Sequence, residues 1–232
     1  MRAGRLLYFR AVLTTTDVSL TPLSGGTDDL SSIEDALLRP AHLVSSSEVL
    51  GRSCPVPAAA GVYAWYFAPP PTSVPIDGCH TVDGWTLLYV GISPKAPPSN
   101  GTQPSRQTIR KRIRYHYRGN AYGSTLRLTL GCLLATELDI QLRRVGSGTR
   151  MTFGPMGERR LTDWMAGHAR VAWVTTAEPW TAEATMIKQR VLPLNLDQNR
   201  HCAFHQHLSA ARADQRAGAR SLPVLTATPA RQ

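Results

Sequence analysis

The apolar positions of this chain follow two different spacings, which separate predicted strands from predicted helices. Residues 61–68 and 86–93 are short runs rich in Tyr, Trp, Phe, Val and Leu, a composition typical of β-strands. The proline-rich segment 69–75 between them cannot occupy a central strand, so the two runs are predicted to form an antiparallel pair joined by a long loop. Residues 169–177 predict a third core strand.

Helical spacing begins after residue 106. Ile109 and Ile113 lie four residues apart, and another apolar stripe follows Ser124, a residue type that caps helix N-termini. Further periodic segments predict three more helices, at 157–169, 181–191 and 205–217, and Thr181 is the expected cap of the second. Alternating residues within 139–153, around Gly146-Ser147-Gly148, predict a β-hairpin.

This order of elements favours an α+β fold, in which a small antiparallel or mixed β-sheet of three core strands is flanked by helices and carries an extra β-hairpin. We expect the main domain to span residues 53–200. Residues 1–52 are expected to form an N-terminal extension with a possible strand at Leu6–Leu13 and a short helix at Ser32–Leu38. Residues 201–232 are expected to form a basic tail, helical at first and then disordered.

Composition and charge narrow the range of partners. The 232 residues are 42% hydrophobic, which allows a packed core, and carry a formal charge of +10 that favours polyanions. No apolar run reaches the length of a membrane span, and Arg10 interrupts the apolar N-terminal segment, so we expect a cytoplasmic protein with no membrane partner. The four scattered cysteines, which form no CxxC pair, are expected to be reduced thiols.

The positive charge is concentrated between residues 101 and 136, where no Asp or Glu occurs. A run of charge is most often only a solvated helix face. Here the absence of any local counter-charge predicts a track for a nucleic-acid backbone, formed by Arg106, Arg110, Lys111, Arg114, Arg118 and Arg127. Backbone contacts of this kind do not depend on base sequence.

Two tripeptides in the paired strands resemble the signature of the GIY-YIG nuclease family. They are Gly61-Val62-Tyr63 and Tyr89-Val90-Gly91, with valine in place of isoleucine in both. The rest of the family's order is also present: a helix with Arg112 and His116, then a third strand, a helix with Glu183, and Asn195. The resemblance covers residues 61–195 and implies a GIY-YIG-like fold, with residues 53–200 as the nuclease domain.

The resemblance also implies a role for each of these side chains. Tyr63 would take part in activating the attacking water and Tyr89 in binding the phosphate. Glu183 would hold a divalent ion, Mg²⁺ or Mn²⁺. Arg112, His116 and Asn195 would complete the catalytic set, and cleavage would leave 5′-phosphate and 3′-hydroxyl ends.

The residue types support part of this picture. Helical spacing puts Arg112 on the face of Ile109, Ile113 and His116, where its charge would be partly desolvated and would need an anion such as a phosphate. Alternatively, Arg112 reaches the surface or pairs with a structural carboxylate. Glu183 supplies a single carboxylate, which is sufficient for Mg²⁺ when phosphate and water complete the coordination. Alternatively, its charge only stabilises the N-terminus of its helix through the helix dipole.

Structural interpretations also remain open for the other site residues and for the tail. Tyr63 and Tyr89 could be ordinary sheet aromatics, His116 a structural histidine and Asn195 a loop amide. The run RHCAFHQH at 200–207 lacks the cysteine pair usual for zinc, so a helix surface or a DNA contact is favoured over a metal site.

Taken together, these features predict a metal-dependent DNA endonuclease that acts on double-stranded or branched DNA, as a monomer or a homodimer. Restriction or defence, repair and mobile-element cleavage all occur in the family, and the absence of an appended DNA-reading module fits defence slightly better. The alternative is a nucleic-acid-binding module that keeps the fold without the chemistry. A small-molecule enzyme is disfavoured because the chain has no glycine-rich phosphate-binding loop.

Overall fold

The computed structural model describes residues 27–97 and 105–226, in which a four-stranded antiparallel sheet has the order β2-β3-β1-β6. The strands are β1 (Gly61–Phe67), β2 (Thr81–Val82), β3 (Trp85–Ser93) and β6 (Ala169–Thr175). β1 lies in the centre and pairs with both β3 and β6. The three predicted core strands and the antiparallel pair are therefore confirmed, and β2 is a two-residue addition at the edge.

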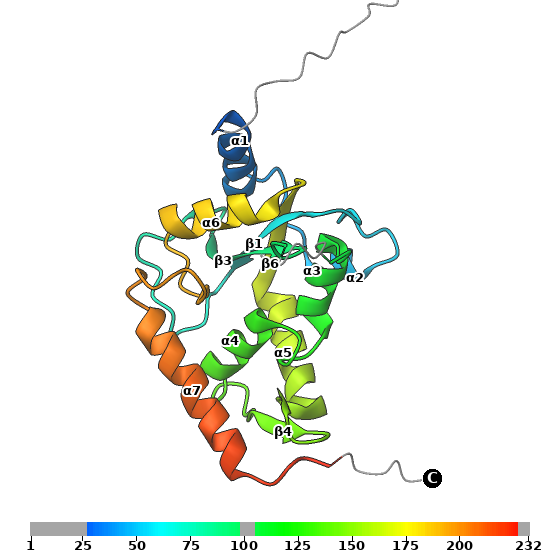
Figure 1. Cartoon of the computed structure of the whole chain (residues 1–232), viewed down its shortest axis with the longest axis vertical. Coiled ribbons are helices and arrows are strands. Elements are labelled where there is room, and N and C mark those ends of the chain that lie inside the picture. The colour runs from blue at the N-terminus through cyan, green and yellow to red at the C-terminus, as the bar shows by residue number, and fades with distance from the viewer. Residues whose placement is uncertain (1–26, 98–104, 227–232) are drawn as a thin grey trace, which may run out of the picture.

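Both faces of the central strand are covered, which explains why β1 has no polar alternation. Tyr63, Trp65 and Phe67 face one apolar core, and Val62 and Tyr66 face the other. The first core is covered by α3 (Ile109–Arg118), whose Ile109 and Ile113 are fully buried, and the second by α1 (Thr27–Leu38) and α6 (Pro179–Gln189) (Figure 1).

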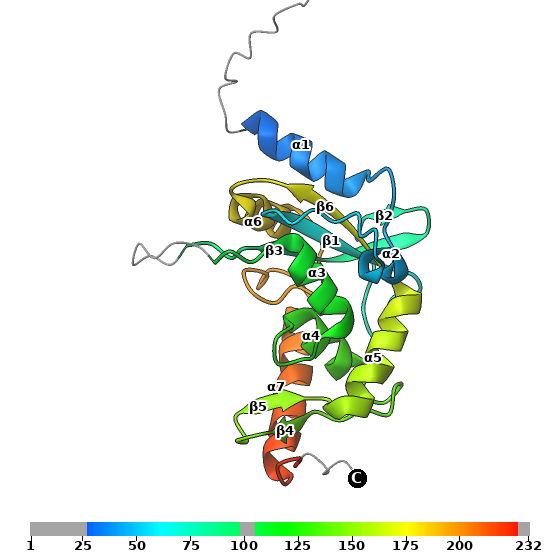
Figure 2. The same cartoon turned by 90° about the vertical axis from the view of Figure 1, so that its right-hand side faces the viewer.

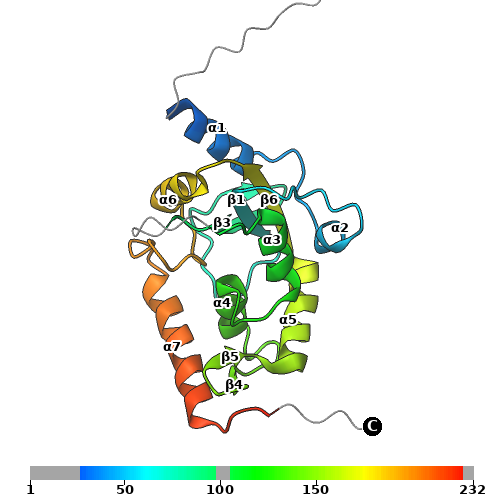
Figure 3. The same cartoon turned by 45° about the vertical axis from the view of Figure 1, so that its right-hand side comes forward.

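A second group of elements extends from the first face of the sheet. It consists of α4 (Thr125–Leu133), α5 (Gly154–His168), the hairpin β4 (Arg143–Val145) and β5 (Arg150–Thr152), and α7 (His205–Ser221) (Figures 2 and 3). α7 packs along α4 and against β4. Arg144 of the hairpin donates hydrogen bonds to the carbonyls of Ala219 and Leu222, which fixes the end of α7 to the hairpin.

Most predicted helices are present, but their bounds differ in places. Ser124 caps α4 as predicted, whereas α6 begins at Pro179 after Glu178, so the expected cap at Thr181 is wrong. Proline fits there because the first residue of a helix needs no hydrogen-bonded N–H. α1 is longer than predicted, α7 continues to Ser221, and the short helix α2 (Ser46–Leu50) was not predicted. The predicted strand at 6–13 and the last six residues lie outside the described residues.

Arg127 is part of the interior and not of a DNA-binding surface. Its side chain is fully buried and forms an ion pair with Glu158 of α5, with Nη2 2.7 Å from Oε2. It also donates to the carbonyls of His116 and Tyr117 and to the hydroxyl of Thr162. The prediction that Arg127 extends the basic track is wrong, because its charge is already compensated by a carboxylate 31 residues further along the chain.

Loss of this buried pair should strongly destabilise the protein. Arg127→Met would leave Glu158 uncompensated in a mostly buried place, and we expect the free energy of unfolding to fall by about 3–5 kcal/mol. The control Arg118→Met removes an exposed charge and should change it by less than about 0.5 kcal/mol. Urea unfolding followed by circular dichroism measures both, and equal midpoints for the two variants would contradict the account.

Candidate active site

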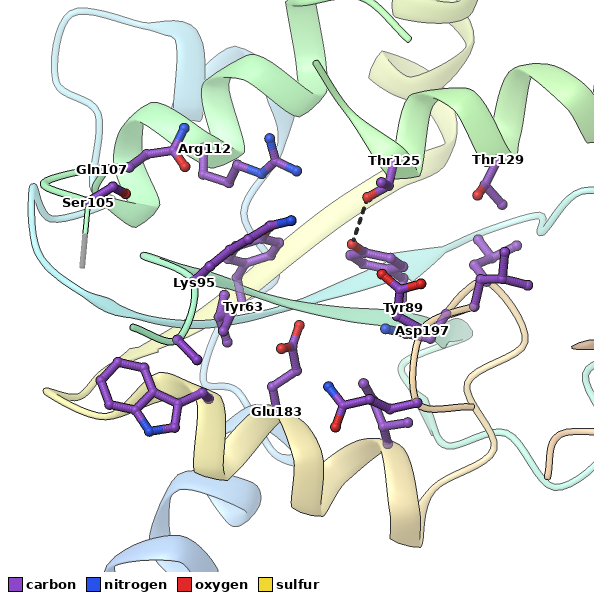
Figure 4. A pocket seen from close by; sticks show the side chains of 18 of the residues that line it. Tyr63, Tyr89, Lys95, Ser105, Gln107, Arg112, Thr125, Thr129, Glu183 and Asp197 are labelled. Atoms are coloured by element: carbon purple, nitrogen blue, oxygen red, sulfur yellow. Dashed lines mark hydrogen bonds between the residues drawn. The ribbon is translucent and has the colours of Figure 1, made fainter. Parts of the chain in front are cut away.

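A pocket of about 740 Å³ opens beside the sheet, between the N-terminal ends of α3 and α4 on one side and α6 with the 194–198 loop on the other (Figure 4). Five of the six predicted catalytic residues line it: Tyr63, Tyr89, Arg112, Glu183 and Asn195. Elements far apart in the sequence thus bring two phenols, a guanidinium, a carboxylate and an amide to one cavity. The volume lies within the range of ordinary ligand sites.

The two glycines of the tripeptides have a steric role in building the pocket. Tyr63 lies opposite Gly91 across the sheet, and a Cβ at position 91 would come within 2.9 Å of the tyrosine ring. A Cβ at Gly61 would meet the carbonyl of Val174 on β6. Glycine therefore lets β1 approach β6 and lets the Tyr63 ring lie across β3.

Tyr63 and Tyr89 share the sheet face that forms the floor of the pocket, where Tyr89 is diagonal to Tyr63 because it pairs with Trp65. Burial raises the pKa of both phenols, so both are neutral in the free protein, while the nearby charge of Arg112 acts in the opposite direction. The hydroxyl of Tyr89 lies 3.4 Å from Oγ1 of Thr125 (Figure 4).

His116 lies behind Tyr63 and not in the pocket itself. Its ring is fully buried, with Nε2 2.8 Å from the hydroxyl of Tyr63 and Nδ1 2.7 Å from the hydroxyl of Ser124. Burial, followed by the charges of Arg112 and Arg127, holds the pKa of His116 well below its usual value, so the ring is neutral. The predicted residue therefore touches the site through Tyr63.

The surrounding hydrogen bonds select one tautomer of His116. The hydroxyl of Ser124 already accepts from the N–H of Arg127, and within the described chain its own proton has no acceptor except Nδ1 of His116. The ring proton then lies on Nε2 and is donated to the phenol oxygen of Tyr63. Tyr63 keeps its own proton for an acceptor in the pocket.

Removing the Ser124 hydroxyl should disturb this arrangement in a visible way. In Ser124→Ala the preference for the Nε2–H tautomer should be lost, as ¹⁵N NMR of the histidine ring would report, and loss of the helix cap should lower stability by about 1 kcal/mol. Thr108→Ala removes the cap of α3 and is the control, because it should cost similar stability without changing the tautomer. An unchanged His116 spectrum in Ser124→Ala would contradict the assignment.

Arg112 extends from α3 over the two tyrosines. Its Nη1 donates to the carbonyl of Gly123 at 2.7 Å, which orients the guanidinium, and no carboxylate lies within ion-pair distance among the residues that the structure describes. The alternative that Arg112 pairs with a structural carboxylate is therefore wrong. The remaining donors face the pocket (Figure 4), where they are available to an anion.

Glu183 lies across the pocket from Arg112, on α6, and its carboxylate points toward the two tyrosines (Figure 4). Burial raises its pKa to about 7; Lys95 lowers the pKa, and Asp197 raises it further. A carboxylate that is costly to ionise gains from a cation beside it. Glu183 and the nearby Asp197 thus fit a hard divalent ion that takes its other ligands from phosphate and water.

No group of three or more His, Cys, Asp or Glu side chains that could hold a metal occurs in residues 27–97 and 105–226. This includes the run at 200–207, where the zinc interpretation was already disfavoured. The four cysteines are free thiols, as predicted. A divalent ion in this protein would therefore depend on few protein ligands.

Asn195 braces the floor of the pocket. Its amide forms two hydrogen bonds with the backbone of Val90, donating to the carbonyl at 2.8 Å and accepting from the N–H at 2.9 Å. The N–H of Leu194 also donates to the carbonyl of Leu88. The 194–195 segment thereby completes the open edge of β3 next to Tyr89. Both ends of the Asn195 amide are bonded to the β3 backbone, so Asn195 supports the pocket and is more than a loop amide.

The predicted basic track is divided by the structure. Arg106, Lys111 and Arg118 are exposed. By contrast, Arg110 donates to the carbonyl of Val56, and Arg114 donates to three carbonyls at the end of α2. These two arginines attach residues 49–56 to α3, so only Arg106, Lys111 and Arg118 of the predicted track are exposed.

Other residues of the pocket were not singled out from the sequence. Lys95 lies two residues after the end of β3 and points into the pocket beside Tyr63 (Figure 4). Asp197 also lines the pocket and had no assignment from the sequence, and Arg212 was assigned only to the basic tail. For Arg212 a sequence pattern did exist, because Leu208, Arg212 and Ala219 share one face of α7 and are all buried.

Comparison with known proteins gives one match. The family model for the GIY-YIG catalytic domain matches residues 61–214 of this chain. No curated protein and no solved structure that was compared gives a match. The matched region extends past residue 200, where the nuclease domain was predicted to end, and includes Arg212. In the described part of the chain, no helix is both long and apolar enough to cross a membrane.

Proposed function

Because the chain belongs to the GIY-YIG nuclease family, we propose that it is a metal-dependent DNA endonuclease that hydrolyses phosphodiester bonds. One observation carries this proposal. The guanidinium of Arg112, which has no carboxylate partner in the described part of the chain, lies across the pocket from the carboxylate of Glu183, with two phenols between them. An anionic diester needs a cation for its oxygens, a ligand for a divalent ion and a polar group for the attacking water. This pocket offers all three.

Arg112 would bind the non-bridging oxygens of the scissile phosphate and stabilise the charge that develops on them during attack. Glu183, with Asp197 nearby, would hold Mg²⁺ or Mn²⁺, and the bound ion would supply further positive charge next to the phosphate. Tyr89 on the pocket floor and Thr125 at the start of α4 would position a phosphate oxygen.

Tyr63 would hold the attacking water. The water oxygen would form a bond to phosphorus while the bond to the 3′ oxygen breaks, which gives a 5′-phosphate and a 3′-hydroxyl. Tyr63 is neutral in the free protein, so its phenolic proton would first leave to solvent through the pocket. The proton lost by the water would then pass to the Tyr63 phenolate, and the 3′ oxygen would take a proton from solvent. Arg112 and the Nε2–H of His116 favour the phenolate against the effect of burial on its pKa.

The exposed cations Arg106, Lys111 and Arg118 would contact the DNA backbone beyond the pocket. A restriction-like or defence role, or a repair role, in the cytoplasm fits such an enzyme. Cutting both strands with one pocket per chain calls for a homodimer or for two successive nicks. Linear product that appears without a nicked intermediate would indicate the homodimer.

The test is incubation with supercoiled plasmid, linear duplex and branched DNA in Mg²⁺, in Mn²⁺ and in EDTA. We expect nicked or linear products in the metal-containing reactions and none in EDTA. DNA binding without cleavage of any substrate would overturn the proposal in favour of a non-catalytic nucleic-acid-binding module.

A further inference from the structure

Arg212 is a buried arginine whose charge has no partner in the described residues. The residue is only 8% exposed and lies on α7, the helix that packs along α4. Its Nε is completely buried without a hydrogen-bond acceptor. Throughout residues 27–97 and 105–226, no carboxylate lies within ion-pair distance of its guanidinium. Burial accordingly lowers its pKa.

Such an arrangement is costly in the free protein. A buried arginine normally has a carboxylate or several carbonyls around it, as Arg127 has in this same chain. Asp197 is an acid whose charge raises the pKa of Arg212, but it is exposed and not in ion-pair contact. A ligand that supplies an anion would compensate the buried charge of Arg212, and this would account for its position.

The position of Arg212 indicates where that anion would lie. Arg212 lines the same pocket as Arg112 but reaches it from α7, near the C-terminal end of α4. The charge of Arg212 lowers the pKa of Cys132, which lies one turn after Thr129 on α4. Arg112 approaches from α3, at the end marked by Gln107 (Figure 4). The pocket therefore has a cationic side chain from each of two different walls.

We propose that Arg212 binds a second backbone phosphate of the DNA strand, next to the scissile phosphate held by Arg112. The inference rests on the proposed function, because it takes the ligand to be a nucleic-acid strand. It makes α7 part of the substrate site instead of a solvated tail. Two phosphates held by two walls would fix the path of the strand through the pocket and so place the scissile bond over Tyr63.

The experiment measures equilibrium binding of a short DNA duplex in EDTA, where no strand is cut, at several salt concentrations. Arg212→Met should weaken binding about 10- to 100-fold and lower the slope of log Kd against log salt by about one. The matched control is Arg220→Met, which removes an exposed charge from the same helix and should change Kd less than about twofold. Binding by Arg212→Met that equals binding by Arg220→Met would overturn the inference.

Thermal unfolding of the free variants guards against a purely structural explanation. Because the arginine is uncompensated, Arg212→Met should raise the unfolding midpoint of the DNA-free protein. If the midpoint falls instead, the variant Arg212→Lys tests the phosphate contact, since it keeps the positive charge but loses the planar guanidinium with its paired N–H donors. Weaker DNA binding by the lysine variant at unchanged stability supports the phosphate contact, and unchanged binding overturns it.

A further measurement separates this inference from the proposed function. If the wild-type chain bound no DNA, the endonuclease proposal would be wrong, and the anion site would be decided with inorganic pyrophosphate. A rise in the unfolding midpoint of the wild type that is absent in Arg212→Met would still support an anion site at Arg212. An equal rise in both proteins, or no rise in either, would overturn it.

Discussion

Replacing Glu183 with glutamine is expected to abolish DNA cleavage and to stabilise the metal-free protein above pH 7. Cleavage should fall at least about 1000-fold, because glutamine keeps the shape of the side chain but removes the charged ligand for the divalent ion. DNA binding should remain, since the cations of α3 are unchanged. A Glu183→Gln variant that cuts plasmid at the wild-type rate would remove Glu183 from the mechanism.

The effect on stability follows from the pKa of about 7, which lies above the ordinary value of 4.5. A raised carboxyl pKa stabilises the fold fully below pH 4.5, and this contribution is lost as the pH rises through 7. Glutamine resembles the protonated form and keeps the contribution at all pH values. Unfolding of Glu183→Gln should therefore cost up to about 3 kcal/mol more than wild type at pH 8, and less than about 1 kcal/mol more at pH 5.

Glu178→Gln is the control for both effects. Glu178 precedes the same helix but is exposed and makes no capping hydrogen bond, so its variant should cleave DNA normally and show no pH-dependent gain in stability. Denaturant unfolding at pH 5 and pH 8 measures the stability of wild type and of both variants, and plasmid nicking measures their cleavage activity. A difference between Glu183→Gln and wild type that does not grow with pH would contradict the assigned burial of this carboxylate.

Arg112→Ala is expected to reduce the cleavage rate by at least about 1000-fold while DNA binding weakens by less than about tenfold. The guanidinium would act mainly on charge that develops during attack, and DNA affinity arises from many backbone contacts. Arg112→Lys keeps the charge but loses the fork, so it should recover only part of the rate. Single-turnover cleavage and equilibrium binding separate the two effects.

The control for this prediction is Arg118→Ala, on the same helix. Its side chain is exposed, and the proposed contact is with the DNA backbone only, so this change should weaken binding without lowering the maximal cleavage rate. The proposed role of Arg112 would be excluded if Arg112→Ala weakened DNA binding but left the maximal cleavage rate unchanged, as is expected for Arg118→Ala.

Local patterns in the sequence predicted the strands of the sheet and the orientation of α3, and the family resemblance predicted most of the pocket. The aromatic run of β1 predicts a strand, although only the structure shows that both its faces are covered, and Ile109 and Ile113 orient α3 so that Arg112 faces the sheet. The resemblance added Glu183 and Asn195, whose long-range placement no periodicity reveals. The pocket then brought these side chains together with the two tyrosines.

What the sequence could not predict depends on contacts between distant segments. Arg127 looked like a surface charge because no acid lies nearby in the sequence, but Glu158 reaches it from α5. Arg114 looked like part of a DNA track until its guanidinium was found to bind the carbonyls at the end of α2. Arg212 was grouped with a tail. The spacing of Leu208, Arg212 and Ala219 marks one face of α7, but it does not reveal that this helix packs on α4 and that Arg212 lines the pocket.

The most direct measurement is a crystal structure of the protein with a short DNA duplex and Ca²⁺, which would hold the complex without cleavage. The account predicts a backbone phosphate inside the pocket, with Arg112 bound to its oxygens and Ca²⁺ between the phosphate and Glu183 on the opposite side. A duplex that instead lies along Arg106, Lys111 and Arg118 and leaves the pocket empty would contradict it.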